Sequence, residues 1–279
     1  MSGAPRRRLP VTVGLLLVSA FLMAPTVLVV LISFGQDPVI RWPPALATLH
    51  WYREFFDTAA WVDATLRSVG LGIAAAVGAM AVGTLAAFGL VRGQFRLHRA
   101  VETLAIGPLI VPPVVLATGG YSFYTQLGLV GSFGGLALLH VVLGVPFVVL
   151  TVSAALVRTD PSLELASAGL GANRAVTFRR VTLPVILPAV ISGGLFAFLT
   201  SFDEVIISQF IIRGAGGTLP VRIFASLTTG LTPVVAAIST LQVVVAVTAL
   251  AALGALGRVQ ARRTIGATGA DAQQTDFRP

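Results

Sequence analysis

Two adjacent carboxylic acids interrupt an apolar stretch in the C-terminal half of the chain, in the order Ser201-Phe202-Asp203-Glu204. In a helix that begins at Pro184, a rise of about 1.5 Å per residue places this pair about 25 to 30 Å from the start, deep in a membrane or near its external face. Ionised groups at such a depth are costly and usually face a bundle interior, a cavity or a partner. Adjacent helical positions point in different directions, so we expect one acid to face a path while the other pairs or caps.

A carboxylate at Asp203 would attract a cationic solute by Coulomb interaction in a low-dielectric path. Aromatic rings near this level can hold alkylammonium groups by cation-π contacts. The candidate path residues are Asp203, Glu204, Ser201, Phe202, Tyr121 and Tyr124. Two alternatives stay open: the acids make helix-end or inter-subunit contacts, or the aromatics, Phe123 included, anchor helices at the membrane interface, which we favour for the rings.

No catalytic or metal-binding constellation is found in the sequence. The three histidines, His50, His98 and His140, fall in different predicted compartments, so no site assembles from them and we expect no enzymatic activity. His140 lies in an apolar run, which favours an interhelical hydrogen bond over a ligand or proton relay. The chain has no cysteine for a thiolate site and no lysine for a P-loop, so any ATP-driven step needs another chain.

The longest internal polar segment, residues 158–183, has the pattern of a helical hairpin. Asp160-Pro161-Ser162 is typical of a helix start, and Gly169 and Gly171 punctuate the end of that helix. A second short helix is predicted from Asn173 to Val181. The segment is therefore too regular in pattern to be a slack linker.

The stretches Glu164–Ala172 and Phe178–Pro184 resemble the EAA loop of binding-protein-dependent ABC importer permeases of type I. The family pattern is Glu-Ala-Ala, three residues, Gly, nine residues, Ile, one residue, Leu-Pro. Alignment on Gly171 fits the spacing throughout. It places Leu165 at the position where the family pattern has Glu, and Glu164 lies one residue earlier. The other positions match Ala166 and Ser167 to the two Ala, Val181 to the Ile, and Leu183 and Pro184 to Leu-Pro.

This resemblance implies that the hairpin docks into a cleft on a separate ATPase subunit. A short helix with an acid at its N-terminus and a glycine at its turn makes a rigid knob that can transmit ATPase closure. The implied partners are an ATPase dimer that binds ATP and Mg, a second homologous permease chain in a heterodimer, and an extracytoplasmic solute-binding protein, with no cofactor on this chain. The implied coupling residues are Glu164, Leu165, Ala166, Ser167, Gly171, Arg174, Arg179, Arg180, Leu183 and Pro184.

The acid segment continues the resemblance towards one branch of these permeases. Ser201–Val205, Thr218-Leu219-Pro220 and residues 226–241 are similar to the second permease chain of spermidine/putrescine importers. The resemblance implies a polyamine substrate. Alternatives are another small solute, such as an amino-acid derivative, opine, phosphonate or metal chelate, and an ion-coupled secondary transporter, which would more often show internal repeats and several buried ionisable groups.

The elements that position these residues are membrane-spanning helices. Of 279 residues, 56% are hydrophobic and only 11% are charged, too few to cover a soluble surface. Apolar runs long enough to cross the hydrocarbon core predict an all-α polytopic membrane protein with six spans. Pro108, Pro112 and Pro113 predict a kink or break in the third. The spans are 11–34, 64–91, 103–123, 133–157, 184–212 and 233–256.

The expected organisation is a cytoplasmic tail at 1–10, an uncleaved first span at 11–34, an external loop at 35–63, a permease core at 64–257 and a cytoplasmic tail at 258–279. Fourteen of the nineteen arginines fall on one side of this topology, which places both termini and the 158–183 loop in the cytoplasm. The family resemblance implies that the membrane is the inner membrane of a bacterium. The net charge of +8 comes from short arginine clusters between apolar runs and not from one basic face, so nucleic-acid binding is not expected.

Overall fold

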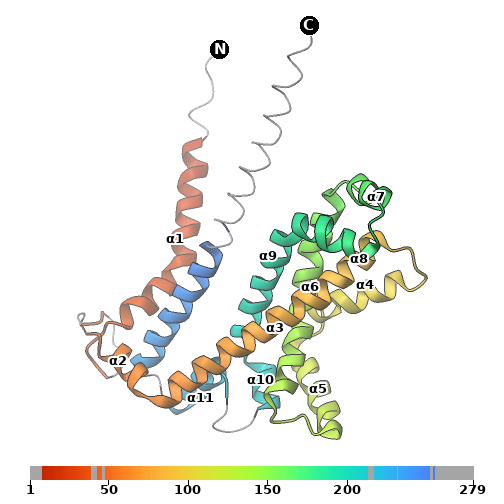
Figure 1. The fold of residues 1–279 in the computed structure, drawn as a ribbon. Coiled ribbons are helices and arrows are strands. Elements are labelled where there is room, and N and C mark those ends of the chain that lie inside the picture. The colour runs from red at the N-terminus through yellow and green to blue at the C-terminus, as the bar shows by residue number, and fades with distance from the viewer. Residues whose placement is uncertain are drawn as a thin grey trace, which may run out of the picture. The chain divides into compact units, whose positions relative to one another are not determined.

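The computed structural model describes residues 8–38, 43–45, 48–212, 217–230, 232–251 and 254. Five helices in these ranges are long and apolar enough to cross a membrane, or six if one bent pair counts as a single span. The prediction of an all-α polytopic membrane protein is therefore confirmed (Figure 1). The chain divides into two compact units, residues 1–63 with 223–246 and residues 64–222 with 247–279.

The first unit contains α1 (Arg8–Ile32), with Pro25 inside it, and α2 (His50–Asp57). The sequence indicated only a polar and aromatic loop where α2 lies. The helix is fixed by a hydrogen bond of 2.7 Å from the indole N–H of Trp51 to the carbonyl of Gly35, which satisfies a buried donor. The described part of this unit also takes in most of the final span, Pro233–Ala251.

The second unit is built on α3 (Ala59–Arg92), α6 (Phe133–Arg158) and α9 (Leu183–Phe202). Their shared core consists of small and β-branched side chains, among them Ala79, Val148, Val152 and Ala197. Small residues on α3 allow a close approach of the helices, since a Cβ built on Gly83 would lie 2.7 Å from the Cβ of Val148.

The third predicted span is broken, as its prolines indicate. It comprises α4 (His98–Ile106), a 3₁₀ turn (Gly107–Leu109) and α5 (Pro113–Leu127), and the two arms are bent by 108°. Proline lacks an N–H donor, and the residue before it is driven out of the helical region, here Pro112 with ψ 135°.

The fifth span is shorter than predicted. The apolar run to residue 212 suggested one helix, but α9 ends at Phe202 and a separate short helix, α10 (Ile206–Ile211), follows. The break is caused by Glu204, whose carboxylate accepts hydrogen bonds from the first free N–H groups of α10. The last helix before the final span is α11 (Leu219–Thr229).

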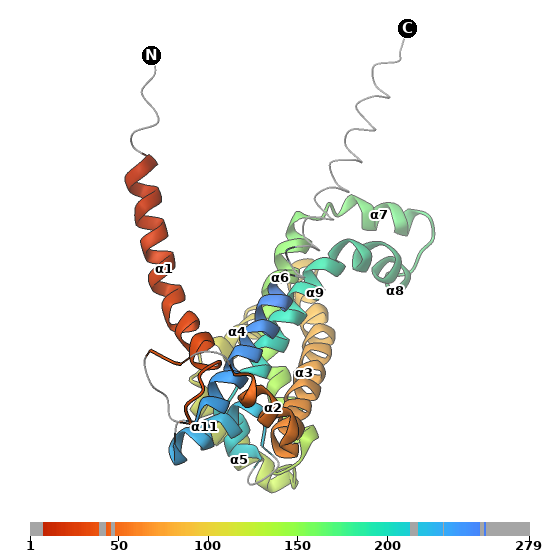
Figure 2. The same ribbon diagram turned by 90° about the vertical axis from the view of Figure 1, so that its left-hand side faces the viewer.

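Between α6 and α9 the chain forms α7 (Ser162–Gly169), α8 (Arg174–Thr177) and a π-helical turn (Phe178–Thr182) that leads directly into α9. The second short helix predicted from Asn173 to Val181 therefore does not stop at Val181. Figures 1 and 2 show this hairpin beyond the ends of α6 and α9. Residues 1–7 and the predicted C-terminal tail at 258–279 lie outside the described residues.

Close packing of α6 on its neighbours yields a test with a matched control in the same helix. A Cβ on Gly144 would lie 2.7 Å from the Cβ of Ala197 and 3.0 Å from that of Ala79, whereas a Cβ on Gly134 would meet nothing within 4 Å. We expect Gly144→Ala to lower the free energy of unfolding by about 1–3 kcal/mol through overpacking. Gly134→Ala should be neutral or slightly stabilising. Thermal unfolding of the detergent-purified protein measures both; equal effects would contradict this packing.

Candidate functional site

The hairpin of α7 and α8 is built by local hydrogen bonds that follow from its sequence. The carboxylate of Asp160 accepts from the N–H of Ser162 at 2.8 Å, and this bond holds the pKa of Asp160 below its usual value. Asn173 is the N-cap of α8, and its side-chain oxygen accepts from the N–H of Val176 at 2.9 Å. Both helix starts are thus fixed by the residue types that predicted them.

The turn between the two helices depends on Gly171. Its φ of 85° lies in the left-handed region, where a side chain is strained although the space around the Cβ position is open. Its N–H donates to the carbonyl of Ala168 at 2.9 Å, and the N–H of Ala172 donates to that of Ser167 at 3.2 Å. These bonds close α7 with a tight turn, as a rigid knob requires.

Glu164 is turned inward, towards this chain's own residues. Arg92, at the end of α3, donates from Nε to Glu164 Oε1 at 3.2 Å and from Nη2 to the carbonyl of Thr159 at 3.0 Å. Thr182 donates its hydroxyl to the same carboxylate oxygen at 3.3 Å. Glu164 thus joins α3, α7 and the π-helical turn. From the sequence, Arg92 counts only among the fourteen arginines on one side of the topology, because nothing in the spacing connects residues 72 positions apart.

The outward face of the hairpin is apolar at its tip and basic on its second arm. Leu165 is 72% exposed and Leu170 is 90% exposed. The side chains of Arg174, Arg179 and Arg180 are exposed as well, as are Ala166 and Pro184, whereas Ser167 and Leu183 are half-buried. A pocket of about 520 Å³ lies between the end of α3 and the hairpin and is lined by Phe88, Arg92, Glu164, Leu165, Arg174 and Phe178.

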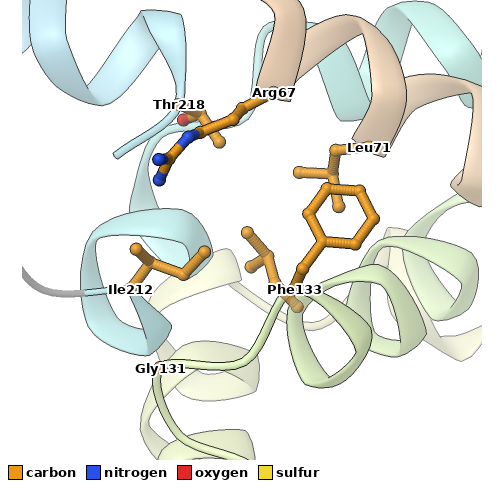
Figure 3. A pocket seen from close by; sticks show the side chains of 7 residues that line it. Arg67, Leu71, Gly131, Phe133, Ile212 and Thr218 are labelled. Carbon is orange, nitrogen blue, oxygen red and sulfur yellow. The ribbon is translucent and has the colours of Figure 1, made fainter. Parts of the chain in front are cut away.

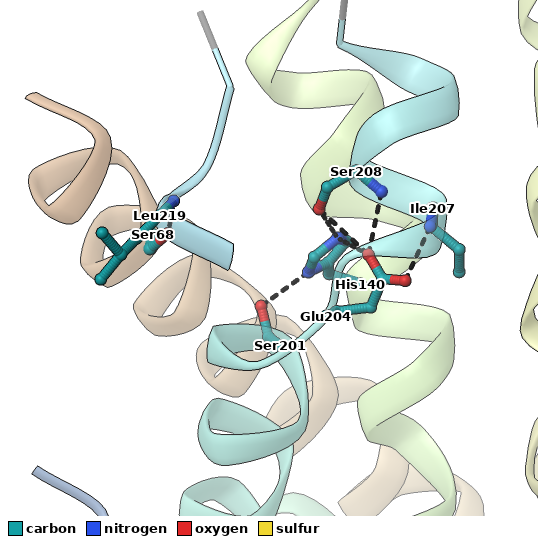
Figure 4. Close-up of polar contacts among 7 residues, drawn as sticks. All are labelled: Ser68, His140, Ser201, Glu204, Ile207, Ser208 and Leu219. Carbon is teal, nitrogen blue, oxygen red and sulfur yellow. Dashed lines mark hydrogen bonds and ion pairs between the residues drawn. The ribbon is translucent and has the colours of Figure 1, made fainter. Parts of the chain in front are cut away.

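A second polar cluster is centred on the acid pair. Glu204 accepts from the N–H groups of Ile207 at 2.7 Å and Ser208 at 2.9 Å, and from the hydroxyl of Ser208 at 3.0 Å (Figure 4). Its carboxylate also lies 3.6 Å from Nε2 of His140. Glu204 is therefore the acid that caps α10 and contacts His140.

His140 is fully buried in α6 and connects the two sides of the break. Its Nδ1 lies 2.7 Å from the hydroxyl of Ser201 at the end of α9, and its Nε2 lies 3.3 Å from the hydroxyl of Ser208 in α10. The interhelical hydrogen-bonding role predicted for His140 is confirmed. This residue holds the fifth span in register across its interruption.

The other candidate path residues are placed differently from one another. Asp203 is exposed at the end of α9. Ser201 is bonded to His140, and Phe202 is buried and stacks on Phe198 with centroids 5.6 Å apart. Tyr124 is buried against α10, and Tyr121 is half-buried beside the same cluster. Of the candidates, Asp203 alone has an exposed charge, and a path role for the set stays a prediction.

The arrangement of helices has known counterparts among solved structures. A chain of the bacterial ABC transporter that imports the acidic polysaccharide alginate matches with a TM-score of 0.68 at 13% identity, covering 91% of this chain and 98% of that one. A chain of the MetNI methionine ABC transporter in an inward-facing conformation matches with a TM-score of 0.55 at 16% identity, covering 79% and 99%. The fold is that of an ABC transporter transmembrane domain.

Sequence relatives place the chain more narrowly. The family described as binding-protein-dependent transport system inner membrane component matches residues 79–264. The spermidine/putrescine transport system permease protein PotC of Haemophilus influenzae is 33% identical over 81% of this chain and 88% of its own length. The putrescine transport system permease protein PotI of Escherichia coli is 32% identical over 86% and 88%.

The chain therefore belongs to the binding-protein-dependent transport system inner membrane component family, as a multi-pass permease subunit of an ABC importer. The predicted resemblance to binding-protein-dependent ABC importer permeases, and to those of polyamine importers, is confirmed by these relatives.

The ion pair of Arg92 and Glu164 predicts a coupled effect on the hairpin. Arg92→Gln and Glu164→Gln should each speed hydrogen exchange in residues 162–182, and the double variant should add little. We expect a coupling energy of about 0.5–1 kcal/mol, because both side chains are part-buried. Arg96→Gln, an exposed arginine four positions further on, is the control and should leave exchange unchanged. Additive effects of the two substitutions would disprove the pair.

Proposed function

We propose that this chain forms half of the translocation path of an ATP-driven importer for a polyamine, which an extracytoplasmic binding protein delivers. The observation that carries the proposal is that the two acids have different surroundings. The carboxylate of Glu204 is hydrogen-bonded within the chain, whereas that of Asp203 is exposed at the end of α9. Such a carboxylate suits a polyammonium solute. The substrate names of the two permease relatives support the same solute class.

The importer is proposed to contain two ATPase subunits, which bind ATP and Mg, and a second homologous permease chain in a heterodimer. This chain then needs no cofactor of its own. The excess of arginine on one side of the topology supports cytoplasmic termini and a cytoplasmic hairpin. With this orientation, the end of α9 at Asp203 faces the extracytoplasmic half of the path.

The hairpin is proposed as the ATPase contact, through its outward face. The acid expected there, Glu164, is bonded to Arg92, so the partner meets the exposed Leu165 and Leu170 and the arginines of the second arm. Exposed leucines at the tip of a small rigid hairpin are suited to an apolar cleft. Arg174, Arg179 and Arg180 supply charge-assisted hydrogen bonds at its edge.

The turn at Gly171 gives a test of coupling. Gly171→Val should reduce transport-coupled ATP hydrolysis by about tenfold, because a β-branched side chain is strained at φ 85° and distorts the hairpin. Gly171→Asn, which tolerates this φ, should retain most of the activity. The control is Gly169→Val, where the Cβ position is open and φ is not left-handed. Leu165→Ala should have a smaller effect than Gly171→Val, and the opposite ranking would overturn the rigid-knob account.

Asp203 gives the test of solute class. Asp203→Asn keeps the shape of the side chain and removes its charge, so uptake of radiolabelled spermidine or putrescine by the reconstituted importer should fall about tenfold. The amount of assembled complex should stay the same, because Asp203 is exposed. Asp57→Asn, an exposed acid in α2, is the matched control and should transport normally. Unchanged uptake in Asp203→Asn, or loss of the complex, would refute a path role.

A further inference from the structure

Among the described residues, a pocket of about 330 Å³ in the second unit is lined by one cation and by apolar walls (Figure 3). Its cation is Arg67, which extends from α3 and lies beside Thr218. The walls are Leu71, Phe133, Leu136 and Ile212. The pocket, called here the Arg67 pocket, opens where helices end: Ile212 follows α10, and Thr218 precedes α11.

Within the described residues, the polar side chains of the Arg67 pocket are an exposed arginine and a buried hydroxyl. The hydroxyl of Thr218 is buried, with the residue 3% exposed, and it has no hydrogen-bond partner within the described ranges. Within the same ranges, the ion pair formed by an arginine joins Arg92 to Glu164, and it does not involve Arg67. A buried hydroxyl left unbonded costs about 1–3 kcal/mol, so this arrangement favours a ligand that accepts hydrogen bonds.

The backbone segments that carry these donors are held by neighbouring contacts. Ser68, next to Arg67 in α3, accepts a buried hydrogen bond of 2.8 Å from the N–H of Leu219, next to Thr218. On the other side of the pocket, the N–H of Gly131 donates to the carbonyl of Ile211 at 2.9 Å. The backbone around the pocket is therefore held in place before a ligand binds, which lowers the ordering cost of binding.

From these groups we propose that the Arg67 pocket receives a carboxylate side chain of the extracytoplasmic binding protein when that protein docks. A planar guanidinium matches a carboxylate in two parallel hydrogen bonds, and the Thr218 hydroxyl supplies a third donor. The apolar walls fit the methylene groups that carry such a carboxylate. The choice of partner rests on the proposed function. The arginine distribution places these helix ends outside the cell, where that partner would dock.

Two other occupants fit less well. A polyammonium solute is repelled by Arg67, so the pocket is not a second solute site. A phospholipid phosphate has suitable acceptors, but its acyl chains must run along the flank of a lipid-facing helix. The pocket is instead formed by segments at helix ends, at Gly131, Ile212 and Thr218. A protein loop approaching those ends reaches the donors more directly.

The test measures docking of the binding protein that supports polyamine uptake, on the full importer complex in lipid nanodiscs. Arg67→Gln should raise the dissociation constant by about tenfold or more, and Thr218→Val by about threefold to tenfold. Arg67→Lys should lie between wild type and Arg67→Gln, because it keeps the charge and loses the paired bonds. Arg53→Gln removes an exposed arginine of α2 that does not line the pocket, and it should change docking by less than about twofold.

A free carboxylate gives an independent measurement. Propionate should weaken docking to the wild-type complex more than an equal concentration of chloride does, and this difference should vanish in Arg67→Gln. Thermal unfolding of each variant complex separates a lost contact from a lost fold: a docking defect in a complex that unfolds at the wild-type temperature supports the proposal.

Three outcomes separate the alternatives. If Arg67→Gln weakens docking no more than Arg53→Gln does, the carboxylate site is disproved. If native mass spectrometry finds a phospholipid retained by wild type and lost from Arg67→Gln while docking is unchanged, the occupant is a lipid and the proposal falls. If the wild-type complex neither docks the binding protein nor takes up polyamines, the proposed function has failed, which is distinct from a failure at Arg67 alone.

Discussion

Polar groups removed from water must find partners within the protein, and this constraint shapes the second unit around Glu204. Its carboxylate accepts bonds from two backbone N–H groups and one hydroxyl, and it lies beside His140. An unsatisfied carboxylate in these apolar surroundings would be very costly. The same bonds end α9 and start α10, so one side chain both stabilises the break and creates it.

The close approach of α3, α6 and α9 makes this cluster possible. A Cβ on Gly193 in α9 would lie 2.7 Å from the Cα of Val148 in α6, so the two backbones are nearly in contact. His140 and Ser201 lie on the same pair of helices, and their bond of 2.7 Å needs that closeness. Small residues therefore set the distance at which the polar residues can meet.

Sequence reasoning predicted the features that depend on local pattern. The proline break in the third span, the helix start at Ser162 and the turn at Gly171 follow from residues that act on their immediate neighbours. The interruption after Phe202 was missed, because apolar run length alone cannot reveal that a carboxylate will cap a new helix. Arg92 was missed for a related reason: its partner Glu164 is distant in the sequence, and only the fold brings the two together.

The two candidate segments share one arrangement, in which a half-buried acid is bonded within the chain and its neighbour is exposed. Glu164 binds Arg92 and Thr182, and Leu165 beside it faces outward; Glu204 caps α10, and Asp203 beside it stays exposed. Glu164 and Leu165 are adjacent in α7, where neighbouring positions point in different directions, whereas Asp203 and Glu204 lie in the turn between α9 and α10. The acid that the family pattern places at Leu165 is therefore not simply displaced to Glu164. That carboxylate is bonded within the chain, and the position beside it carries an exposed leucine.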